Sequence, residues 1–181
     1  SGAVGQVVGQ IAKIMGCTVI GTAGSDEKIK FILDELGFDY AINYKKENIL
    51  ESLDKFCPDG IDIYFDNVGG ELTDAVMDRL RIGARISVCG QISQYNNSQL
   101  ELGPRNLGAL VRTQSKMQGF LVHSYSNRYQ EGLDRMSKWI KEGKLKYKEF
   151  IVPGIENAPK TFLGMLNGEN FGKTLIKVSD D

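Results

Sequence analysis

Two glycines at the beginning of the chain, Gly2 and Gly5, open directly into a helix of apolar period and suggest a pyrophosphate site. They match the second and third glycines of the motif G-x-G-x-x-G. Such a turn presents free backbone N–H groups and the positive end of the helix dipole to a phosphate. Gly2 would let the backbone approach the phosphates, and Gly5 would let the helix pack close to a sheet. A glycine-rich turn that only caps a core helix is the alternative.

The residues after the next apolar run indicate which dinucleotide would fit. In NAD sites an acidic residue about 20 positions beyond the glycines binds the ribose 2′-hydroxyl. Here the run ends in Gly21–Ser25 without a carboxylate, and Lys28 follows one helical turn later. Ser25 and Lys28 could supply the donors and the positive charge that a 2′-phosphate needs, which favours NADP. The alternative for Lys28 is a solvated surface lysine. Asp26 is close enough to compete, but its side chain is expected to point along the helix start.

Three further polar residues follow expected strands. Asn67 could hydrogen-bond a ribose or the nicotinamide region, or it could simply form the turn before Gly69. Tyr95 lies in a polar loop that follows the expected strand at 84–90, at the same end of the sheet. Its hydroxyl could act there as a hydrogen-bond donor or a proton relay. Capping of the loop is its alternative role. His123 has no carboxylate or nucleophile beside it in the sequence, so it is interpreted as a polar residue at a strand end.

Helices and strands alternate along the chain in the pattern of a parallel α/β sheet. Strands are expected at residues 18–22, 40–44, 61–65, 84–90 and 117–122. Helices are expected at residues 4–15, 25–36, 47–56, 71–80, 107–113 and 129–142. A strand-helix-strand tail follows at 150–154, 156–166 and 174–178. The fold class is a Rossmann-type doubly wound parallel sheet. A phosphate turn normally follows a buried strand, so the first strand is expected to be missing and the chain to be a fragment of a longer protein.

Composition limits the partners. The 181 residues carry a net charge of −1 without a basic cluster, so nucleic acid is not expected as a partner. Apolar runs are too short for a membrane span. The three cysteines lack paired ligand spacing, so no metal site is expected, and free thiols in a reducing compartment fit a cytoplasmic protein.

The assembled motifs resemble the medium-chain dehydrogenase/reductase superfamily. Within it, the chain is similar to the zinc-independent prostaglandin reductase and alkenal double-bond reductase group. The matching strings run in order along almost the whole chain: Ser1-Gly-Ala-Val-Gly5, Gly24-Ser-Asp-Glu-Lys28, Ile42-Asn-Tyr-Lys45, Tyr64-Phe-Asp-Asn-Val-Gly-Gly70, Cys89-Gly-Gln-Ile-Ser-Gln-Tyr-Asn96 and Gly168-Glu-Asn-Phe-Gly-Lys173.

The resemblance implies NADPH-dependent reduction of the activated C=C bond of α,β-unsaturated ketones or aldehydes, of 15-oxoprostaglandin or alkenal type. Tyr95 resembles the tyrosine that orients cofactor and substrate and is the catalytic candidate. The pyrophosphate would be held by Gly2, Ala3, Val4 and Gly5, and the 2′-phosphate end by Lys28 and Tyr44, beside Ser25. The ribose and nicotinamide would be lined by Asn67, Cys89, Gly90, Gln91, Ile92 and Tyr95, the carboxamide by Phe120, Leu121 and Val122, with Asn170 reaching the cofactor from the tail.

The resemblance also implies a domain organisation. Residues 1–145 would form the NADP-binding domain, and residues 146–181 would return to an N-terminal catalytic domain absent from this chain, which alone would have little or no turnover. A homodimer through the edge strand at 117–122 is possible by analogy. The alternatives are a quinone or carbonyl reductase of the same superfamily and a non-catalytic NADP-binding module. An adenosine-cofactor methyltransferase is disfavoured because the second strand lacks a terminal acidic residue.

Overall fold

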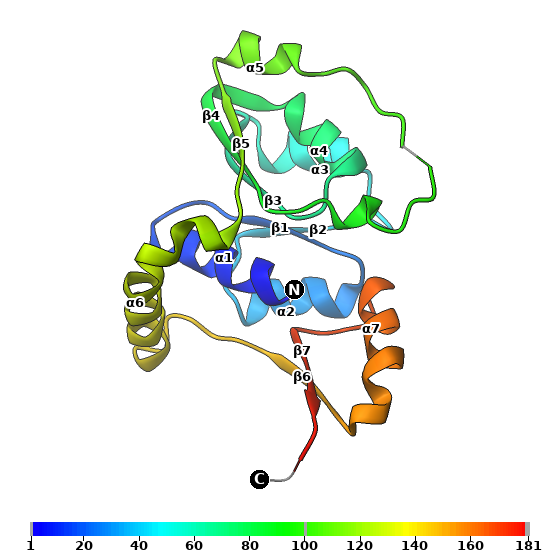
Figure 1. Ribbon diagram of the computed structural model, residues 1–181. Helices are drawn as coiled ribbons and strands as arrows, with labels where there is room; N and C mark the ends of the chain where they lie inside the picture. The colour runs from blue at the N-terminus through cyan, green and yellow to red at the C-terminus, as the bar shows by residue number, and fades with distance from the viewer. Residues whose placement is uncertain (1, 100, 180–181) are drawn as a thin grey trace. The chain divides into compact units, whose positions relative to one another are not determined.

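The computed structural model describes residues 2–99 and 101–179 (Figure 1), so Ser1 of the glycine turn lies outside the described residues. The chain forms two compact units, Ser1–Glu47 with Glu131–Asp181, and Asn48–Gln130. Helices and strands alternate in both, and the strand pairs of the described residues are parallel. The predicted α/β class with parallel strands is therefore confirmed. No helix in the described ranges combines the length and apolarity that a membrane crossing would need.

The first compact unit begins with two helices and two strands in alternation. They are α1 (Ala3–Ile14), β1 (Ile20–Ala23), α2 (Asp26–Asp34) and β2 (Tyr40–Asn43). Strands β1 and β2 pair in parallel, with Ala23 opposite Asn43 at their carboxyl ends. Because the two strands end side by side, the residues that follow them meet at one edge. Phe31 and Ile32 of α2 form a core cluster with Leu36, which follows the helix.

Helix α1 buries a different face from the one its apolar residues predict. Val4 and Met15, two of the apolar residues in the predicted helix at 4–15, are 42% and 64% exposed, whereas Gln6, Gly9 and Gln10 are buried. The glutamines are buried because they bind the backbone of the tail, which local periodicity cannot reveal. The glycine of α1 that allows close packing is Gly9, rather than Gly5 as predicted. A Cβ on Gly9 would lie 1.8 Å from Phe38 Cζ, whereas a Cβ on Gly5 would meet no described atom within 4 Å.

The tail is a parallel strand pair joined by a helix. Strand β6 (Glu149–Pro153) pairs with β7 (Lys173–Lys177), and a short 3-10 turn η3 (Ile155–Asn157) and helix α7 (Ala158–Leu166) connect them. It is joined to α1 by hydrogen bonds in which Gln10 and Gln6 each accept an N–H, from Lys146 at 2.8 Å and Lys148 at 3.0 Å. The two glutamine amides also donate to the carbonyls of the same lysines. The chain reaches this tail through α6 (Tyr129–Lys141).

The second unit contains a three-stranded parallel sheet in the order β3-β4-β5. Its strands are β3 (Ile61–Asp66), β4 (Leu80–Val88) and β5 (Lys116–Gly119). Its helices are α3 (Ile49–Phe56), α4 (Gly70–Met77) and α5 (Gly108–Thr113), with 3-10 turns η1 (Ile92–Gln94) and η2 (Val122–Arg128). Strand β5 lies at the edge of this sheet, as the sequence predicted.

The main differences from the predicted boundaries in this unit lie between α4 and β4 and at the end of β5. Helix α4 ends at Met77, and β4 begins at Leu80 rather than Ala84, because Leu80 already pairs with Ile61 and the Ile61 N–H binds the Arg79 carbonyl at 2.8 Å. Strand β5 ends at Gly119, and Val122 begins the turn η2 instead of ending a strand.

Candidate functional site

The amino end of α1 is open and uncapped. Gly2 is its N-cap and supplies no side-chain cap, and its carbonyl accepts the N–H of Gln6 at 3.0 Å as the first helical bond. The N–H groups of the first turn, which include Ala3, Val4 and Gly5, have no acceptor within a helix. Within the described residues, no atom lies within 4 Å of where a Cβ would stand on Gly2 or Gly5. A helix start of this kind suits a diphosphate, so the pyrophosphate site stays a prediction here.

The tail loop lies beside this helix start. Gly172 forms an isolated parallel bridge with Gly2, and the Asn170 amide donates to the Gly172 carbonyl at 3.1 Å. Phe171 fixes the loop, because its ring packs against Phe31 with the centroids 4.9 Å apart. Asn170 is therefore held next to the glycine turn from the other end of the chain.

The residues predicted for the 2′-phosphate gather around Gly24. Ser25 caps α2, and its hydroxyl oxygen accepts the Lys28 N–H at 3.4 Å. The Tyr44 N–H binds the Ala23 carbonyl at 3.2 Å, which brings Tyr44 to the end of β1. A Cβ on Gly24 would lie 2.7 Å from the Tyr44 hydroxyl and 3.2 Å from Lys45 Cε. Ser25, Lys28 and Tyr44 are therefore brought together, and Lys45 joins them.

Positive charge dominates this edge. The half-buried Lys28 ammonium donates to the Gly168 carbonyl at 2.6 Å, which links α2 to the tail loop. Burial lowers the pKa of Lys28, and the nearby charge of Lys45 lowers it further. Because a carbonyl occupies only one of the three N–H donors of the ammonium, the others can bind an anion.

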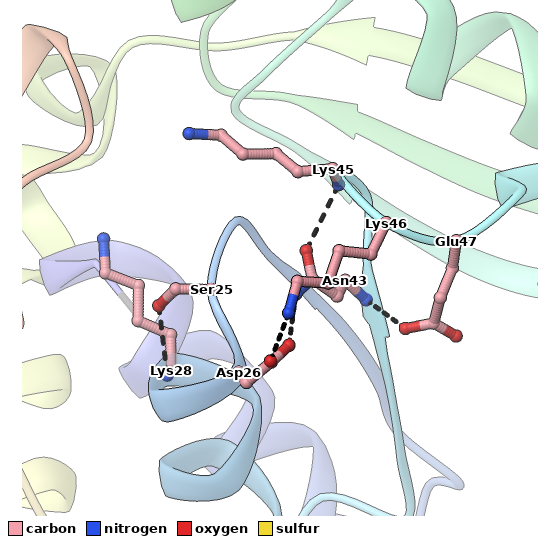
Figure 2. Close-up of polar contacts among 7 residues, drawn as sticks. All are labelled: Ser25, Asp26, Lys28, Asn43, Lys45, Lys46 and Glu47. Carbon is pink, nitrogen blue, oxygen red and sulfur yellow. Dashed lines mark hydrogen bonds and ion pairs between the residues drawn. The ribbon is translucent and has the colours of Figure 1, made fainter.

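Asp26 does not compete for this site. Its carboxylate accepts the Asn43 amide at 2.6 Å and pairs with the Lys46 ammonium, rather than pointing along the helix start (Figure 2). The hydrogen bonds from Lys46 and then Asn43 lower the pKa of Asp26. The local sequence pattern assigns no role to Asn43, Lys45 or Lys46. These residues could have been predicted from the parallel pairing of β1 and β2, because that pairing places the ends of the two strands side by side.

The second unit brings together Asn67, Gly90 and Tyr95. A Cβ on Gly90 would lie 2.8 Å from Asn67 Oδ1 and 2.9 Å from the Tyr95 hydroxyl. The Tyr95 oxygen accepts the Gln91 N–H at 3.1 Å, and Tyr95 is 65% exposed. Accepting this bond leaves its hydroxyl proton able to be donated. Ile92, on the same loop, donates its N–H to the Asn67 carbonyl at 3.3 Å.

A buried carboxylate holds the turn that carries Asn67. Asp66 is 1% exposed and accepts the N–H groups of Val68 and Gly69, each at 2.9 Å. The hydroxyls of Tyr64 and Thr73 donate to the same carboxylate at 3.1 and 2.7 Å. Burial is the main cause that raises the pKa of Tyr64 far above its ordinary value, so this hydroxyl keeps its proton. The residue that follows β4 binds at the same place, because the Cys89 N–H donates to the Asp66 carbonyl at the end of β3, at 2.7 Å.

The residues predicted to bind the carboxamide, Phe120 to Val122, follow β5. The Phe120 N–H binds the Val88 carbonyl at 3.2 Å, and the Phe120 ring packs against Phe65. Leu121 and Val122 are 71% and 58% exposed. The predicted site residues therefore form two groups, one in each compact unit.

Known proteins resemble this chain over almost its whole length. The sequence model of the family described as zinc-binding dehydrogenase matches residues 3–138. The chain belongs to this family. It is 55% identical over 183 residues to the putative NADP-dependent oxidoreductase YfmJ of Bacillus subtilis, covering 99% of the chain and 54% of that protein. It is 48% identical over 180 residues to the NADP-dependent 2-alkenal reductase of Nicotiana tabacum, covering 99% and 52%. The medium-chain dehydrogenase/reductase assignment is thus confirmed.

A solved structure supports the fold. CurA from Vibrio vulnificus in complex with NADPH is 48% identical, with a TM-score of 0.95 over 99% of this chain and 55% of that one. The chain spans about half the length of the curated relatives it matches.

The family name implies a zinc ion, for which the described residues offer no suitable ligand set. Within residues 2–99 and 101–179, no group of three or more His, Cys, Asp or Glu side chains could hold a metal. Cys17, Cys57 and Cys89 are free thiols, and burial raises the pKa of Cys57.

Proposed function

We propose that this chain forms the NADPH-binding part of a reductase that reduces the activated C=C bond of α,β-unsaturated ketones or aldehydes. The observation that carries the proposal is the gathering of Ser25, Lys28 and Tyr44 near Gly24, while the Asp26 carboxylate is bound by Asn43. An NAD site would need a carboxylate toward the ribose 2′-hydroxyl, whereas this edge presents donors and cations. Relatives named as an NADP-dependent 2-alkenal reductase and an NADPH-dependent curcumin reductase support the reaction class.

The residues of this chain would bind and orient rather than attack. Gly2, Ala3, Val4 and Gly5 would hold the pyrophosphate, and Ser25, Lys28 and Tyr44 the 2′-phosphate. Bound NADPH would supply a hydride to the β-carbon of the substrate. Tyr95 would donate its hydroxyl hydrogen bond to the ribose or to the substrate oxygen, where negative charge develops. The Gln91 N–H fixes the position of that hydroxyl.

The remaining contacts belong to the nicotinamide end and the tail. In this proposal Asn67, Cys89, Gly90, Gln91 and Ile92 line the ribose and nicotinamide. The backbone of Phe120, Leu121 and Val122 binds the carboxamide, and Asn170 reaches the cofactor from its place beside Gly172.

The proposal extends to the protein as a whole. Residues 1–145 would be the NADP-binding domain, with residues 146–181 returning to a catalytic domain that this chain does not contain. The reaction would be zinc-independent, the substrates of alkenal or 15-oxoprostaglandin type, and the protein cytoplasmic. A homodimer would form through the edge strand β5.

Ligand binding and turnover test the proposal separately. Calorimetric titration with NADPH and NADH should show preference for NADPH, and Lys28→Ala should remove most of that preference. The complete natural protein that carries this chain should then oxidise NADPH in the presence of methyl vinyl ketone faster than with benzoquinone. Faster turnover with benzoquinone would favour the quinone reductase alternative, and binding without turnover on either substrate would favour a non-catalytic module. Equal binding of NADPH and NADH would refute the cofactor assignment.

A further inference from the structure

Two adjacent lysines after β2, Lys45 and Lys46, have opposite surroundings. The Lys46 ammonium pairs with the Asp26 carboxylate. Lys45 extends away from that pair, toward the side on which Lys28 lies (Figure 2). Across the part of the chain that the structure describes, no carboxylate pairs with the Lys45 ammonium. Of these two charges, that of Lys46 is paired with a carboxylate at the surface, and that of Lys45 remains available.

The buried side chain of Asn43 fixes the turn that separates these lysines. Asn43 is 3% exposed, and its amide oxygen accepts the Lys45 N–H at 3.2 Å. Its amide nitrogen donates to Asp26 at 2.6 Å, while its own backbone N–H binds Glu47 Oε1 at 2.7 Å. The backbone from Asn43 to Glu47 is therefore held at several points, and the directions of the two side chains follow from it.

Lys45 also contacts the loop that carries the phosphate-binding candidates. Its Cε lies 3.2 Å from where a Cβ on Gly24 would stand, next to the Tyr44 hydroxyl. Lys45 is close enough to Lys28 for its charge to lower the pKa of that residue. Two ammonium groups repel each other unless an anion lies near both, so the pair favours a dianionic group.

We propose that Lys45 is a second cation for the 2′-phosphate of NADPH and a determinant of cofactor specificity. The turn fixed by Asn43 directs Lys45 to this group and Lys46 to Asp26. This inference rests on the proposed function, which assigned the phosphate to Ser25, Lys28 and Tyr44 alone.

The test compares two nucleotides that differ by the phosphate in question, 2′,5′-ADP and AMP, by calorimetry. Lys45→Ala should weaken 2′,5′-ADP binding by roughly tenfold, the value of one charge-assisted hydrogen bond, and leave AMP unchanged. Lys45→Arg should retain most of the affinity because it keeps the charge. Lys30→Ala, which removes an exposed lysine paired with Asp34 on α2, is the charge-matched control and should bind both nucleotides as the unmodified protein does.

The outcomes separate this inference from the proposed function. If Lys28→Ala weakens 2′,5′-ADP binding and Lys45→Ala does not, the site stands and the role of Lys45 is refuted. Equal losses for 2′,5′-ADP and AMP in Lys45→Ala would also refute it, because the effect would not depend on the 2′-phosphate. If the unmodified protein binds AMP as tightly as 2′,5′-ADP, the proposed function fails together with the inference.

Discussion

The side-chain amide of Asn43 donates a hydrogen bond of 2.6 Å to the carboxylate of Asp26, and this contact joins the end of β2 to the start of α2. The same buried side chain accepts the N–H of Lys45. Asn43 therefore holds the Asp26 carboxylate away from Lys28 and Lys45, the two lysines of the proposed phosphate site. In the proposed site, this relationship would couple local stability to nucleotide selectivity.

Replacing Asn43 should reduce both properties at once. Asn43→Leu keeps the branched shape of the side chain but removes both of its hydrogen bonds, so the free energy of unfolding should fall by about 2 kcal/mol. The preference for 2′,5′-ADP over AMP should also decrease, because Asp26 becomes free to turn and Lys45 loses its support. Urea denaturation and calorimetry would measure the two effects.

Asn48→Ala is the matched control for this variant. Asn48 caps α3 by accepting the Leu50 and Glu51 N–H groups, so its loss should cost about 1 kcal/mol without changing nucleotide selectivity. A loss of selectivity in Asn48→Ala equal to that in Asn43→Leu would show that selectivity merely follows stability.

The local sequence pattern was sufficient to predict which segments form helices and strands, but not which residues of different segments contact each other. The glycines at 16 and 37 end the helices because they adopt positive φ, and Ser25 begins α2 as an N-cap, so these boundaries were predictable. Asn43 acquires its role only when β2 pairs with β1, and Gln6 and Gln10 are buried only because a segment far along the chain, near Lys146, binds them. Such partners are set by topology, which the residue spacing within one helix or strand does not contain.

The two glycines of α1, Gly5 and Gly9, should respond in opposite directions to the same substitution. Gly9→Ala would place a Cβ 1.8 Å from Phe38 Cζ, so the ring must move, and the free energy of unfolding should fall by about 1–3 kcal/mol. Gly5→Ala meets no described atom within 4 Å, and the higher helix propensity of alanine should stabilise the protein by up to about 1 kcal/mol. Thermal and urea denaturation of the pair would show this. A common direction of change would contradict the packing role of Gly9.

Asp39 should make stability depend on pH in the acidic range. The hydrogen bond from Lys13 is the main cause that lowers the pKa of Asp39, and the Val19 N–H, at 2.7 Å, contributes too. A carboxylate with a lowered pKa in the folded state stabilises the protein above its unfolded pKa of about 3.9. That contribution is lost as the pH falls through the lower, folded value. Since the pair is about one third exposed, solvent screening limits it to about 1 kcal/mol.

Asp39→Asn is the variant that isolates this effect. It should be less stable than the unmodified protein by about 1 kcal/mol near neutral pH, and the difference should disappear on acidification below about pH 4. Asp34→Asn removes a carboxylate whose partner Lys30 is 78% exposed, so it should change stability little at any pH. Urea titrations over a pH series provide the measurement. A difference for Asp39→Asn that persists unchanged in acid would mean that its charge is not the cause.

Gly90 should control the positions of Asn67 and Tyr95 together. A methyl group at this position would lie 2.8 Å from Asn67 Oδ1 and 2.9 Å from the Tyr95 hydroxyl, so both side chains must shift. Since displacement of an orienting group by about 1 Å can cost up to about 100-fold in rate, Gly90→Ala should lower kcat/KM for enone reduction at least roughly tenfold. Stability should change less, because Tyr95 is largely exposed.

Comparison with Tyr95→Phe and Gly108→Ala makes this result interpretable. Tyr95→Phe removes the hydroxyl alone, so a larger loss in Gly90→Ala would be due to displacement of Asn67 as well. Gly108 lies at the start of α5, where an added Cβ meets no described atom within 4 Å, so Gly108→Ala should keep full activity. The activities are measured on the complete natural protein with saturating NADPH. Unchanged kcat/KM in both Gly90→Ala and Tyr95→Phe would remove Tyr95 from the reaction, because neither moving its hydroxyl nor deleting it would then matter.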